Sequence, residues 1–388
     1  MPTFSSASKI SEGDGKWRGN IPGNTVGPWS QCSRAKRFQK ARGKARDGST
    51  GSAAEARAMG PGGCARGRVG DTSIRHSGST TTRVHADARR GESSMGTDSA
   101  SAARVDALAE RGVAALWPAK PTELVGDSRV LRALPRVELR RVGPFVFCDH
   151  FGPSPAVPGT MAVPPHPHVG LQTVTYLFSG ALRHRDSVGS VQDIHPGDVN
   201  WMTAGRGIVH AEDVDSSPGA APLHGIQTWV ALPREQRHTE PSFEHVPASR
   251  LPLVEREGAR VRVLAGRLGD AVSPVPTFHP LTYLDVELEA GASVSLPVPS
   301  THALALYVAD GDVAVGGTTV ERGVLAHLDE GASTLSLHSV KGGRAVVFGG
   351  EPLPDPLVIW WNFVVDSVAE GRARLADWEA GRFPSLAP

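Results

Sequence analysis

The stretch "PHPHVGLQTVTY", residues 165–176, places two histidines one residue apart at the start of a strand-like run. Successive side chains of a β-strand point to opposite faces, so His166 and His168 share one face. Pro167 has no amide hydrogen to donate, which places the pair at a strand start, an edge or a bulge. Two imidazoles on one face either share a structural role or bind a metal ion.

A second pair with the same spacing follows in "GIVHAED", where one residue separates His210 from Glu212. The 41 residues between His168 and His210 allow antiparallel strands that bring both pairs to the interior of one small barrel. Three imidazoles and one carboxylate form a mononuclear site suited to Fe(II), Mn(II), Ni(II), Cu(II) or Zn(II). A single carboxylate leaves a bound divalent ion with net positive charge, which favours an anionic ligand.

Short strand-like segments separated by Gly, Pro, Asp and Ser fill most of the chain from Val125 onward. No long helical periodicity interrupts them, so the pattern predicts an all-β fold of barrel or sandwich type. The order of features in residues 241–350 echoes that in residues 120–235. We interpret this echo as an internal duplication that gives two barrels in one chain.

The last part of the chain, residues 351–388, contains "DSVAEGRARLADWEAGRF", which predicts an amphipathic C-terminal helix. Asp366 or Ser367 is suited to cap its start. The second barrel has neither an H-x-H nor an H-x-E pair, so we expect it to hold no metal. Four of its histidines, His279, His302, His327 and His338, are isolated in the sequence.

Residues 1–94 are rich in Gly, Ser, Arg and Ala and show almost no apolar periodicity. They contain 17 Lys and Arg against 7 Asp and Glu, whereas residues 95–388 contain 24 against 33. Such a segment buries too little apolar surface to offset the entropy of ordering, which predicts a disordered basic tail. The tail can attract nucleic acid, but we prefer solvated low-complexity sequence. The acidic remainder argues against direct contact of the barrels with DNA.

Met95 suggests a second explanation for the tail. It stands just before the first helix-like segment, and Gly91-Glu92 can be encoded by the purine-rich GGAGAG, which is like a ribosome-binding site. We hypothesise that translation starts at Met95 and that residues 1–94 are not translated. The mass of the N-terminus in protein from the native source decides this.

The three cysteines, Cys32, Cys64 and Cys148, are too few and too scattered for a disulfide framework or a cysteine-based metal site. We therefore expect a reducing, cytoplasmic environment. No run approaches the roughly 18 apolar residues that a membrane span requires, and the N-terminus lacks the apolar core of a secretory signal. We expect no association with a membrane.

Four long motifs resemble the pirin family, a branch of the cupins. They are "PPHPHVGLQTVTYLFSG", "HRDSVGSVQDIHPGDVNWMTAGRGIVHAED", "LHGIQTWVALP" and "GEPLPDPLVIWWNFV". Pirins are bicupins, in which two β-barrels face each other and the N-terminal barrel holds a metal ion. The resemblance therefore implies a metal-binding cupin barrel at residues 120–235, a cupin barrel without metal ligands at residues 241–350, and a C-terminal segment with a helix.

The metal ligands of the pirin family are three histidines and one glutamate. They fall here on His166, His168, His210 and Glu212, so all four are present. Many pirins have glutamate where this chain has Gln172. That position is not one of the family's ligands, so we expect the difference to affect the polarity of the pocket and not metal binding.

Some pirins have quercetin 2,3-dioxygenase activity, so the resemblance implies an Fe(II)-dependent oxygenase that opens flavonol-like aromatic substrates with O₂. Glu212 would then leave the metal briefly and accept the proton of a substrate hydroxyl as a general base. Other pirins act as partners of transcription factors or metabolic enzymes. An iron-dependent regulatory protein that binds a protein partner is therefore the alternative.

Several residues near the motifs have both a functional and a structural interpretation. His184 and His224 are candidates for donors that orient a ligand, although we favour an ordinary hydrogen-bonded histidine at a strand end for each. Arg206 either faces an anionic substrate at the barrel mouth or is a solvated turn residue.

Two pairs of residues outside the histidine motifs complete the candidates. Trp360 and Trp361 either line an aromatic pocket or pack a linker against a barrel, and we prefer packing. Asp186 and Asp198 are expected to serve turns.

Overall fold

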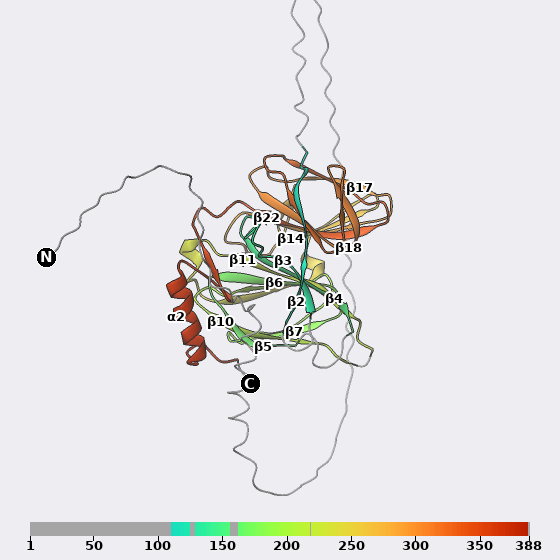
Figure 1. Cartoon of the computed structure of the whole chain (residues 1–388). Coiled ribbons are helices and arrows are strands. Elements are labelled where there is room, and N and C mark those ends of the chain that lie inside the picture. The colour runs from blue at the N-terminus through green and yellow to red at the C-terminus, as the bar shows by residue number, and fades with distance from the viewer. Residues whose placement is uncertain (1–109, 125–128, 156–161, 218, 387–388) are drawn as a thin grey trace, which may run out of the picture. The chain divides into compact units, whose positions relative to one another are not determined.

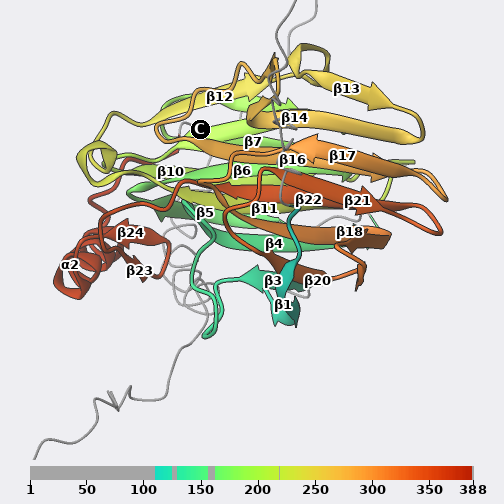
Figure 2. The same cartoon turned by 90° about the horizontal axis from the view of Figure 1, so that it is seen from above.

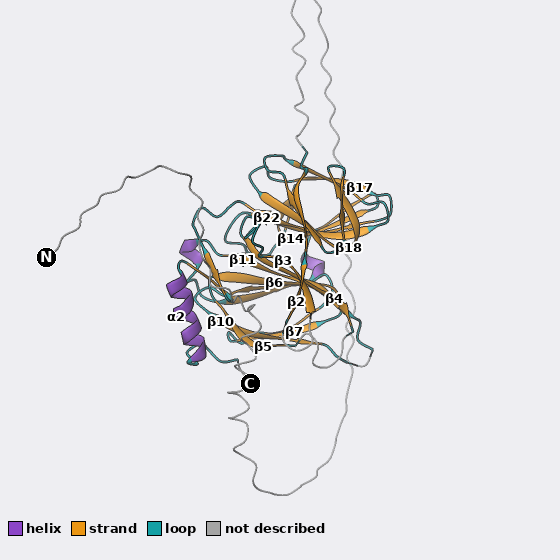
Figure 3. Cartoon of the chain, in the orientation of Figure 1, coloured by secondary structure: helices purple, strands orange, loops and turns teal. Residues whose placement is uncertain are grey.

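The computed structural model describes residues 110–124, 129–155, 162–217 and 219–386. The basic tail and the hypothesis about Met95 lie outside these described residues. Within them the secondary structure is almost entirely β, with one α-helix near the C-terminus (Figure 3). The predictions of an all-β fold and of a C-terminal helix are confirmed.

The first barrel is built from the strands β2 (Lys120–Glu123), β3 (Arg129–Leu134), β4 (Phe145–Ser154), β5 (Val163–His168), β6 (Leu171–Ser179), β7 (Leu182–Asp186), β8 (Val191–Ile194), β9 (Val199–Thr203), β10 (Ile208–Val214), β11 (Leu223–Ala231) and β12 (Ser242–Val246). They form a seven-stranded sheet with the order β12-β9-β6-β11-β4-β3-β2 and a four-stranded sheet with the order β5-β10-β7-β8. In Figure 1 the seven-stranded sheet lies between the four-stranded sheet and the second barrel.

The second barrel is built from the strands β1 (Val113–Pro118), β13 (Leu253–Arg256), β14 (Ala259–Leu268), β15 (Ala271–Val272), β16 (Leu281–Leu288), β17 (Ser293–Pro297), β18 (Ala303–Val315), β19 (Thr318–Glu321), β20 (Val324–Leu328), β21 (Thr334–His338) and β22 (Gly343–Gly350). Its main path of paired strands is β1-β20-β18-β22-β16-β14-β13. Two 3-10 helices, η1 (Arg234–Gln236) and η2 (Ala248–Arg250), lie in the segment that joins the barrels.

The two seven-strand paths correspond strand for strand, which agrees with an internal duplication. One edge strand of each path comes from a part of the chain outside the residues predicted for that barrel. β12 lies within residues 241–350, yet it pairs with β9 of the first barrel. β1 precedes the first barrel in the chain, yet it pairs with β20 of the second barrel. The described start of the chain is therefore part of the second barrel.

The barrels pack through apolar side chains that alternate with those facing each interior. This shared core includes Val174, Tyr176 and Trp201 from the first barrel, and Tyr283 and Phe348 from the second. Because alternate residues of a strand face opposite sides, the same strands line both the interface and a barrel interior.

Two tyrosines at matching positions make reciprocal hydrogen bonds across the interface. The Tyr176 hydroxyl on β6 donates to Asp285 Oδ2 of the second barrel at 2.6 Å. The Tyr307 hydroxyl on β18 lies 3.0 Å from His150 Nδ1 of the first barrel. Since β6 and β18 occupy the same place in their sheets, the pair reflects the approximate symmetry of the two barrels.

After the second barrel the chain returns to the first one. A hairpin of β23 (Val358–Trp360) and β24 (Phe363–Val365) precedes the helix α2 (Val368–Glu379), and Figure 2 shows the three elements side by side. Of the two predicted cap candidates, Asp366 and Ser367, it is the Ser367 hydroxyl that caps α2 by accepting the Glu370 amide at 3.2 Å. A Cβ atom at Gly371 would lie 2.5 Å from Trp360 Cγ, so the helix approaches the hairpin closely because that residue is glycine.

Candidate metal centre

His166 and His168 lie on β5, an edge strand of the four-stranded sheet. This position agrees with the prediction from Pro167, whose missing amide is tolerated at a sheet edge. β5 pairs with β10 so that His166 lies opposite His210. The register brings the two sequence motifs together, because His210 and Glu212 lie on that same neighbouring strand.

The three histidines converge on one point in the barrel interior. Their ring centroids lie 4.9 Å apart for His166 and His168, 4.3 Å for His166 and His210, and 5.0 Å for His168 and His210. One ring nitrogen from each lies within 4.8 Å of the others. All three side chains are buried.

Hydrogen bonds orient the rings. Nδ1 of His166 lies 2.9 Å from the Pro164 carbonyl oxygen, and Nδ1 of His168 lies 3.1 Å from the Asn362 carbonyl oxygen. A carbonyl oxygen only accepts, so in each uncharged ring Nδ1 carries the proton and Nε2 carries the lone pair. Nε2 of His210 is buried and has no hydrogen-bond partner among the described residues. This unpartnered nitrogen, within a cluster of imidazoles, fits a metal ligand.

Burial also selects the protonation state that binds a metal. Loss of hydration lowers the pKa of His166 to about 4. Burial and neighbouring imidazoles lower the pKa of both His168 and His210 well below the ordinary value. The rings are therefore uncharged near neutral pH, which is the form that ligates a metal ion.

Glu212 lies beside this cluster but belongs to a second group, formed with His210 and His184. A β-bulge in the pairing of β10 with β5 separates His210 from Glu212. The Thr175 hydroxyl lies 3.0 Å from Glu212 Oε1 and 2.7 Å from Gln227 Oε1. Burial raises the pKa of Glu212, although His184 and these hydrogen-bonding neighbours oppose the shift. His210 thus links the four predicted ligands.

Several residues that contact the predicted ligands were not anticipated from the sequence. They are Thr175, Gln227, Trp229 and Asn362. Trp229 meets the His168 ring edge-on, with centroids 4.9 Å apart, and stacks on Phe147 at 4.0 Å. Strand alternation after the H-x-H motif was the available signal for Thr175, whereas Asn362 lies 194 residues from His168.

The two other histidine candidates, His184 and His224, lie in different places. His184 lies in the barrel interior, with Nδ1 3.5 Å from Nδ1 of His210. His224 instead lies at the interface between the barrels, where its Nε2 is 2.8 Å from Nε2 of His150. His224 therefore has the position of a structural histidine, whereas His184 lies beside the candidate ligands His210 and Glu212.

The remaining candidates do not reach the cluster. Arg206 forms an exposed ion pair with Glu240. Trp360 and Trp361 pack with Phe363, Leu375 and Phe383 between the hairpin, α2 and the first barrel. The Gln172 amide donates to the Thr203 hydroxyl at 2.9 Å. By strand alternation Gln172 faces away from Thr175 and the site.

The two turn aspartates behave as expected. Asp186 Oδ1 accepts the amides of Val188 and Ser190, each at 3.0 Å. Asp198 accepts the amides of His195 at 3.1 Å and Ala248 at 2.8 Å. Asp186 has an additional partner, because its Oδ2 lies 3.0 Å from His184 Nε2.

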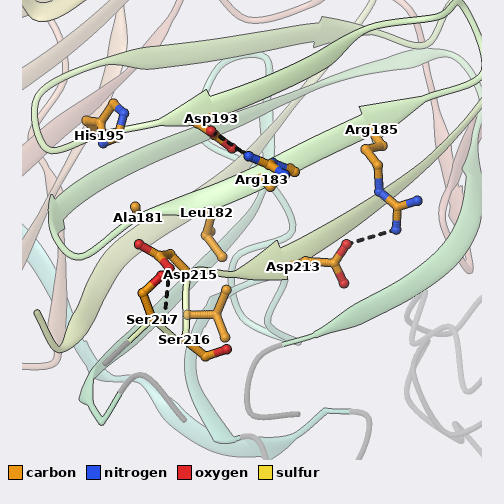
Figure 4. A pocket seen from close by; sticks show the side chains of 11 residues that line it. Ala181, Leu182, Arg183, Arg185, Asp193, His195, Asp213, Asp215, Ser216 and Ser217 are labelled. Atoms are coloured by element: carbon orange, nitrogen blue, oxygen red, sulfur yellow. Dashed lines mark hydrogen bonds and ion pairs between the residues drawn. The ribbon is translucent and has the colours of Figure 1, made fainter. Parts of the chain in front are cut away.

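A polar concavity lies on the outer face of the four-stranded sheet (Figure 4). Its arginines are paired with acidic neighbours, Arg183 with Asp193 at 2.6 Å and Arg185 with Asp213 at 2.9 Å. On β7 these arginines alternate with His184, so they point away from the interior. This concavity is separate from the histidine cluster.

The histidines of the second barrel have other contacts. His279 Nε2 lies 2.8 Å from the Glu351 carbonyl, His302 Nδ1 lies 2.9 Å from the Thr282 hydroxyl, and His338 Nδ1 lies 3.0 Å from the Ser293 hydroxyl. His327 stacks near Trp117. In the described part of the chain, both groups of candidate metal ligands lie in the first barrel.

The two-barrel fold agrees with comparisons to known proteins. Residues 127–230 match the pirin family model, and residues 283–384 match the model of the pirin C-terminal cupin domain. A pirin-like protein from Caulobacter vibrioides is 41% identical over 263 residues, which cover 66% of this chain and 90% of that protein. The chain belongs to the pirin family. The predicted bicupin fold is confirmed.

Two further relatives connect this pirin to known proteins and structures. Human pirin is 34% identical over 257 residues, which cover 65% of this chain and 86% of that protein. The crystal structure of a quercetin 2,3-dioxygenase from Acinetobacter baumannii is 34% identical, with a TM-score of 0.66, over 70% of this chain and 90% of that one.

The cluster of imidazoles and a carboxylate in a cupin barrel supports a divalent metal ion as cofactor. Among the described residues, no helix is long and apolar enough to cross a membrane.

Proposed function

We propose that this pirin is a mononuclear metal-dependent dioxygenase of the quercetin 2,3-dioxygenase type, which opens flavonol-like aromatic substrates with O₂ in the cytoplasm. The observation that carries the proposal is the convergence of three buried, uncharged imidazoles beside a buried carboxylate. The likeness to a solved quercetin 2,3-dioxygenase supports the choice of substrate class.

We propose His166, His168, His210 and Glu212 as the ligands of an Fe(II) ion. When bound, Fe(II) supplies a Lewis acid for an adjacent hydroxyl and carbonyl of the substrate and a redox partner for O₂. Backbone carbonyls hold the rings of His166 and His168 by their Nδ1 atoms. Nε2 of each ring is then the proposed ligand atom.

Glu212 is the proposed general base for the substrate hydroxyl. Burial raises the pKa of Glu212, which makes its carboxylate a better proton acceptor than an exposed one. Thr175 holds Oε1 by a hydrogen bond, so the carboxylate keeps a fixed orientation while it gains the proton. Trp229, which packs against His168 and stacks on Phe147, adds apolar surface beside the cluster.

A regulatory role is the second candidate. The ligand histidines are at most 2% exposed, so a substrate as large as a flavonol enters only if the covering residues move. A metal ion that reports its redox state to a protein partner needs no such movement. The acidic charge of residues 95–388 disfavours direct contact of the barrels with DNA in that role.

A turnover assay separates the two functions. The full chain, loaded with Fe(II), is mixed with quercetin in air, and loss of the flavonol absorbance is followed. We expect turnover that requires both the metal and O₂. Inactivity over a panel of flavonols and catechols, together with recovery of a protein partner in pull-downs, would favour the regulatory role.

The metal centre itself is tested by His168→Ala. Removal of a ligand costs more than the roughly 10–100-fold that is typical of a residue behind a ligand, so we expect loss of most bound metal by elemental analysis. His338→Ala in the second barrel is the matched control and should keep the wild-type metal content. Unchanged metal content in His168→Ala would contradict the site.

A further inference from the structure

The turn between β7 and β8 anchors a buried carboxylate close to the metal centre. Asp186 accepts two backbone amides through Oδ1, those of Val188 and Ser190. Gly189 has a φ of 98°, which only glycine adopts readily, and this shapes the turn around the carboxylate. Because backbone amides only donate, Asp186 must be an acceptor at this position.

The fixed role of Asp186 determines where the proton lies on His184. Asp186 Oδ2 is 3.0 Å from His184 Nε2, so Nε2 donates and carries the proton. An imidazole ring that holds a single proton, on Nε2, carries its lone pair on Nδ1. That nitrogen faces Nδ1 of His210 at 3.5 Å, a long hydrogen bond in which His210 must donate.

The position of the proton on His210 determines which of its nitrogens carries the lone pair. If Nδ1 of the uncharged ring carries the proton, Nε2 presents its lone pair toward His166 and His168. This Nε2 is the buried atom that lacks a hydrogen-bond partner among the described residues. The Pro164 and Asn362 carbonyl oxygens accept from Nδ1 of His166 and His168 and so set the same tautomer in those rings. For His210 the acceptor of the Nδ1 proton is His184.

The surroundings hold His184 in this orientation. Its ring stacks on Phe243 with centroids 4.4 Å apart and planes 13° apart. The His184 side chain is 4% exposed and that of Asp186 is 0% exposed. A ring clamped between an aromatic face and a buried carboxylate has little freedom to turn.

We propose that Asp186 and His184 are positioning residues, which fix the tautomer of His210 so that Nε2 is presented as a metal ligand. The proposal rests on the metal centre described under the proposed function. It differs from an alternative in which His184 itself ligates the metal with Glu212 and His210, the second group of candidate ligands.

The test is Asp186→Asn in the full chain. The amides of Val188 and Ser190 still need an acceptor, so they should bind the oxygen of the new side chain. Its NH₂ group then faces His184 and donates to Nε2. As a result, Nδ1 of His184 donates to Nδ1 of His210, which reverses both hydrogen bonds. In metal-free protein labelled with ¹⁵N-histidine, long-range ¹H–¹⁵N spectra should show His210 with its proton on Nδ1 in the wild type and on Nε2 in the variant. A His210→Gln spectrum assigns the resonance. Competition with a chelator should show roughly 10–100-fold weaker binding of Co(II) in the variant.

Asp198→Asn is the matched control, because Asp198 is also a buried turn carboxylate that accepts two backbone amides. We expect it to leave the His210 tautomer and Co(II) affinity unchanged. His184→Phe keeps the stacking on Phe243 but removes the acceptor, so it should also weaken Co(II) binding roughly 10–100-fold. This second variant tests the proposal if Asp186→Asn does not fold.

Two results would overturn the proposal. One is an unchanged His210 tautomer and Co(II) affinity in both variants. The other is loss of all Co(II) binding in His184→Phe while Asp186→Asn changes nothing, which would make His184 a ligand. If the wild type binds no Co(II) or Fe(II), the proposed function fails, while the tautomer measurement on metal-free protein still decides this proposal.

Discussion

On β6 of the first barrel Thr175 faces Glu212 in the interior, whereas on the matching strand β18 of the second barrel Leu304, Leu306 and Val308 point into an apolar core. The buried members of that core are all Ala, Val or Leu. The interior of the first barrel instead holds four histidines, a glutamate and their hydrogen-bonding partners. The same strand order thus encloses two different interiors.

The difference shows how a duplicated fold divides two tasks. A polar interior is tolerated only when its groups are paired, and the first barrel pairs them through Asp186, Thr175 and the carbonyls of Pro164 and Asn362. The second barrel has no such requirement, and its close-packed aliphatic side chains supply stability. We infer that the second barrel supports the first through the shared apolar interface.

We expect the largest loss of stability from a substitution in the aliphatic core of the second barrel. Leu306 is completely buried in the aliphatic core, so Leu306→Ala should lower the free energy of unfolding by about 2–5 kcal/mol. Urea unfolding of the metal-free chain measures this. Val340→Ala, at a position that is 66% exposed in the same barrel, should change it by less than about 0.5 kcal/mol. A loss below about 1 kcal/mol in Leu306→Ala would show that this interior is not tightly packed.

A smaller effect is expected from the reciprocal tyrosines at the interface. Tyr176→Phe removes a hydrogen bond to the Asp285 carboxylate and should cost about 1.5–3 kcal/mol, as for hydrogen bonds to charged groups. Tyr307→Phe removes a bond to the uncharged His150 ring and should cost about 0.5–1.5 kcal/mol. Urea unfolding compares the two variants. Equal or reversed losses would mean that the charge of Asp285 contributes nothing, for example because Arg344 already neutralises it.

The sequence was sufficient to predict what depends on strand alternation. The one-residue spacing in His166/His168 and His210/Glu212 places each pair on one face, and glycine- and proline-rich punctuation predicts the short strands. The local pattern likewise predicted the C-terminal helix and narrowed its cap to Asp366 or Ser367, of which Ser367 is the cap. These features are determined by residues close together in the chain.

What could not be predicted depends on contacts between distant residues. Nothing near Asn362 indicates that its carbonyl meets His168, because only the return of the hairpin to β5 brings them together. The pairing of β1 with the second barrel is equally invisible in a local pattern. The set of four ligands, His166, His168, His210 and Glu212, stays a prediction. In the described residues His210 belongs both to a group with His166 and His168 and to a group with His184 and Glu212.

The smallest expected effect is the change in the free energy of unfolding per pH unit that the histidines at the interface cause. Burial, followed by the neighbouring His224 and Arg322, lowers the pKa of His150 to about 3. Burial and Arg322 lower the pKa of His224 to about 4. An unfolded histidine titrates near 6.5. As pH falls below that value, the unfolded chain therefore binds protons that the folded chain does not, and the free energy of unfolding decreases.

This linkage predicts that, between pH 6 and pH 4, His150 lowers the free energy of unfolding by about 1 kcal/mol for each unit that the pH falls. The total effect is limited because one histidine takes up at most one proton. His150→Gln keeps a partner for the Tyr307 hydroxyl but does not titrate, so its stability should fall less steeply than that of the wild type over this range. Urea unfolding of metal-free protein at several pH values measures the difference, since the ligand histidines are the same in both chains. Parallel pH profiles would mean that His150 binds protons equally in the folded and unfolded states, and that the interface does not bury it as tightly as the contacts with Tyr307 and His224 indicate.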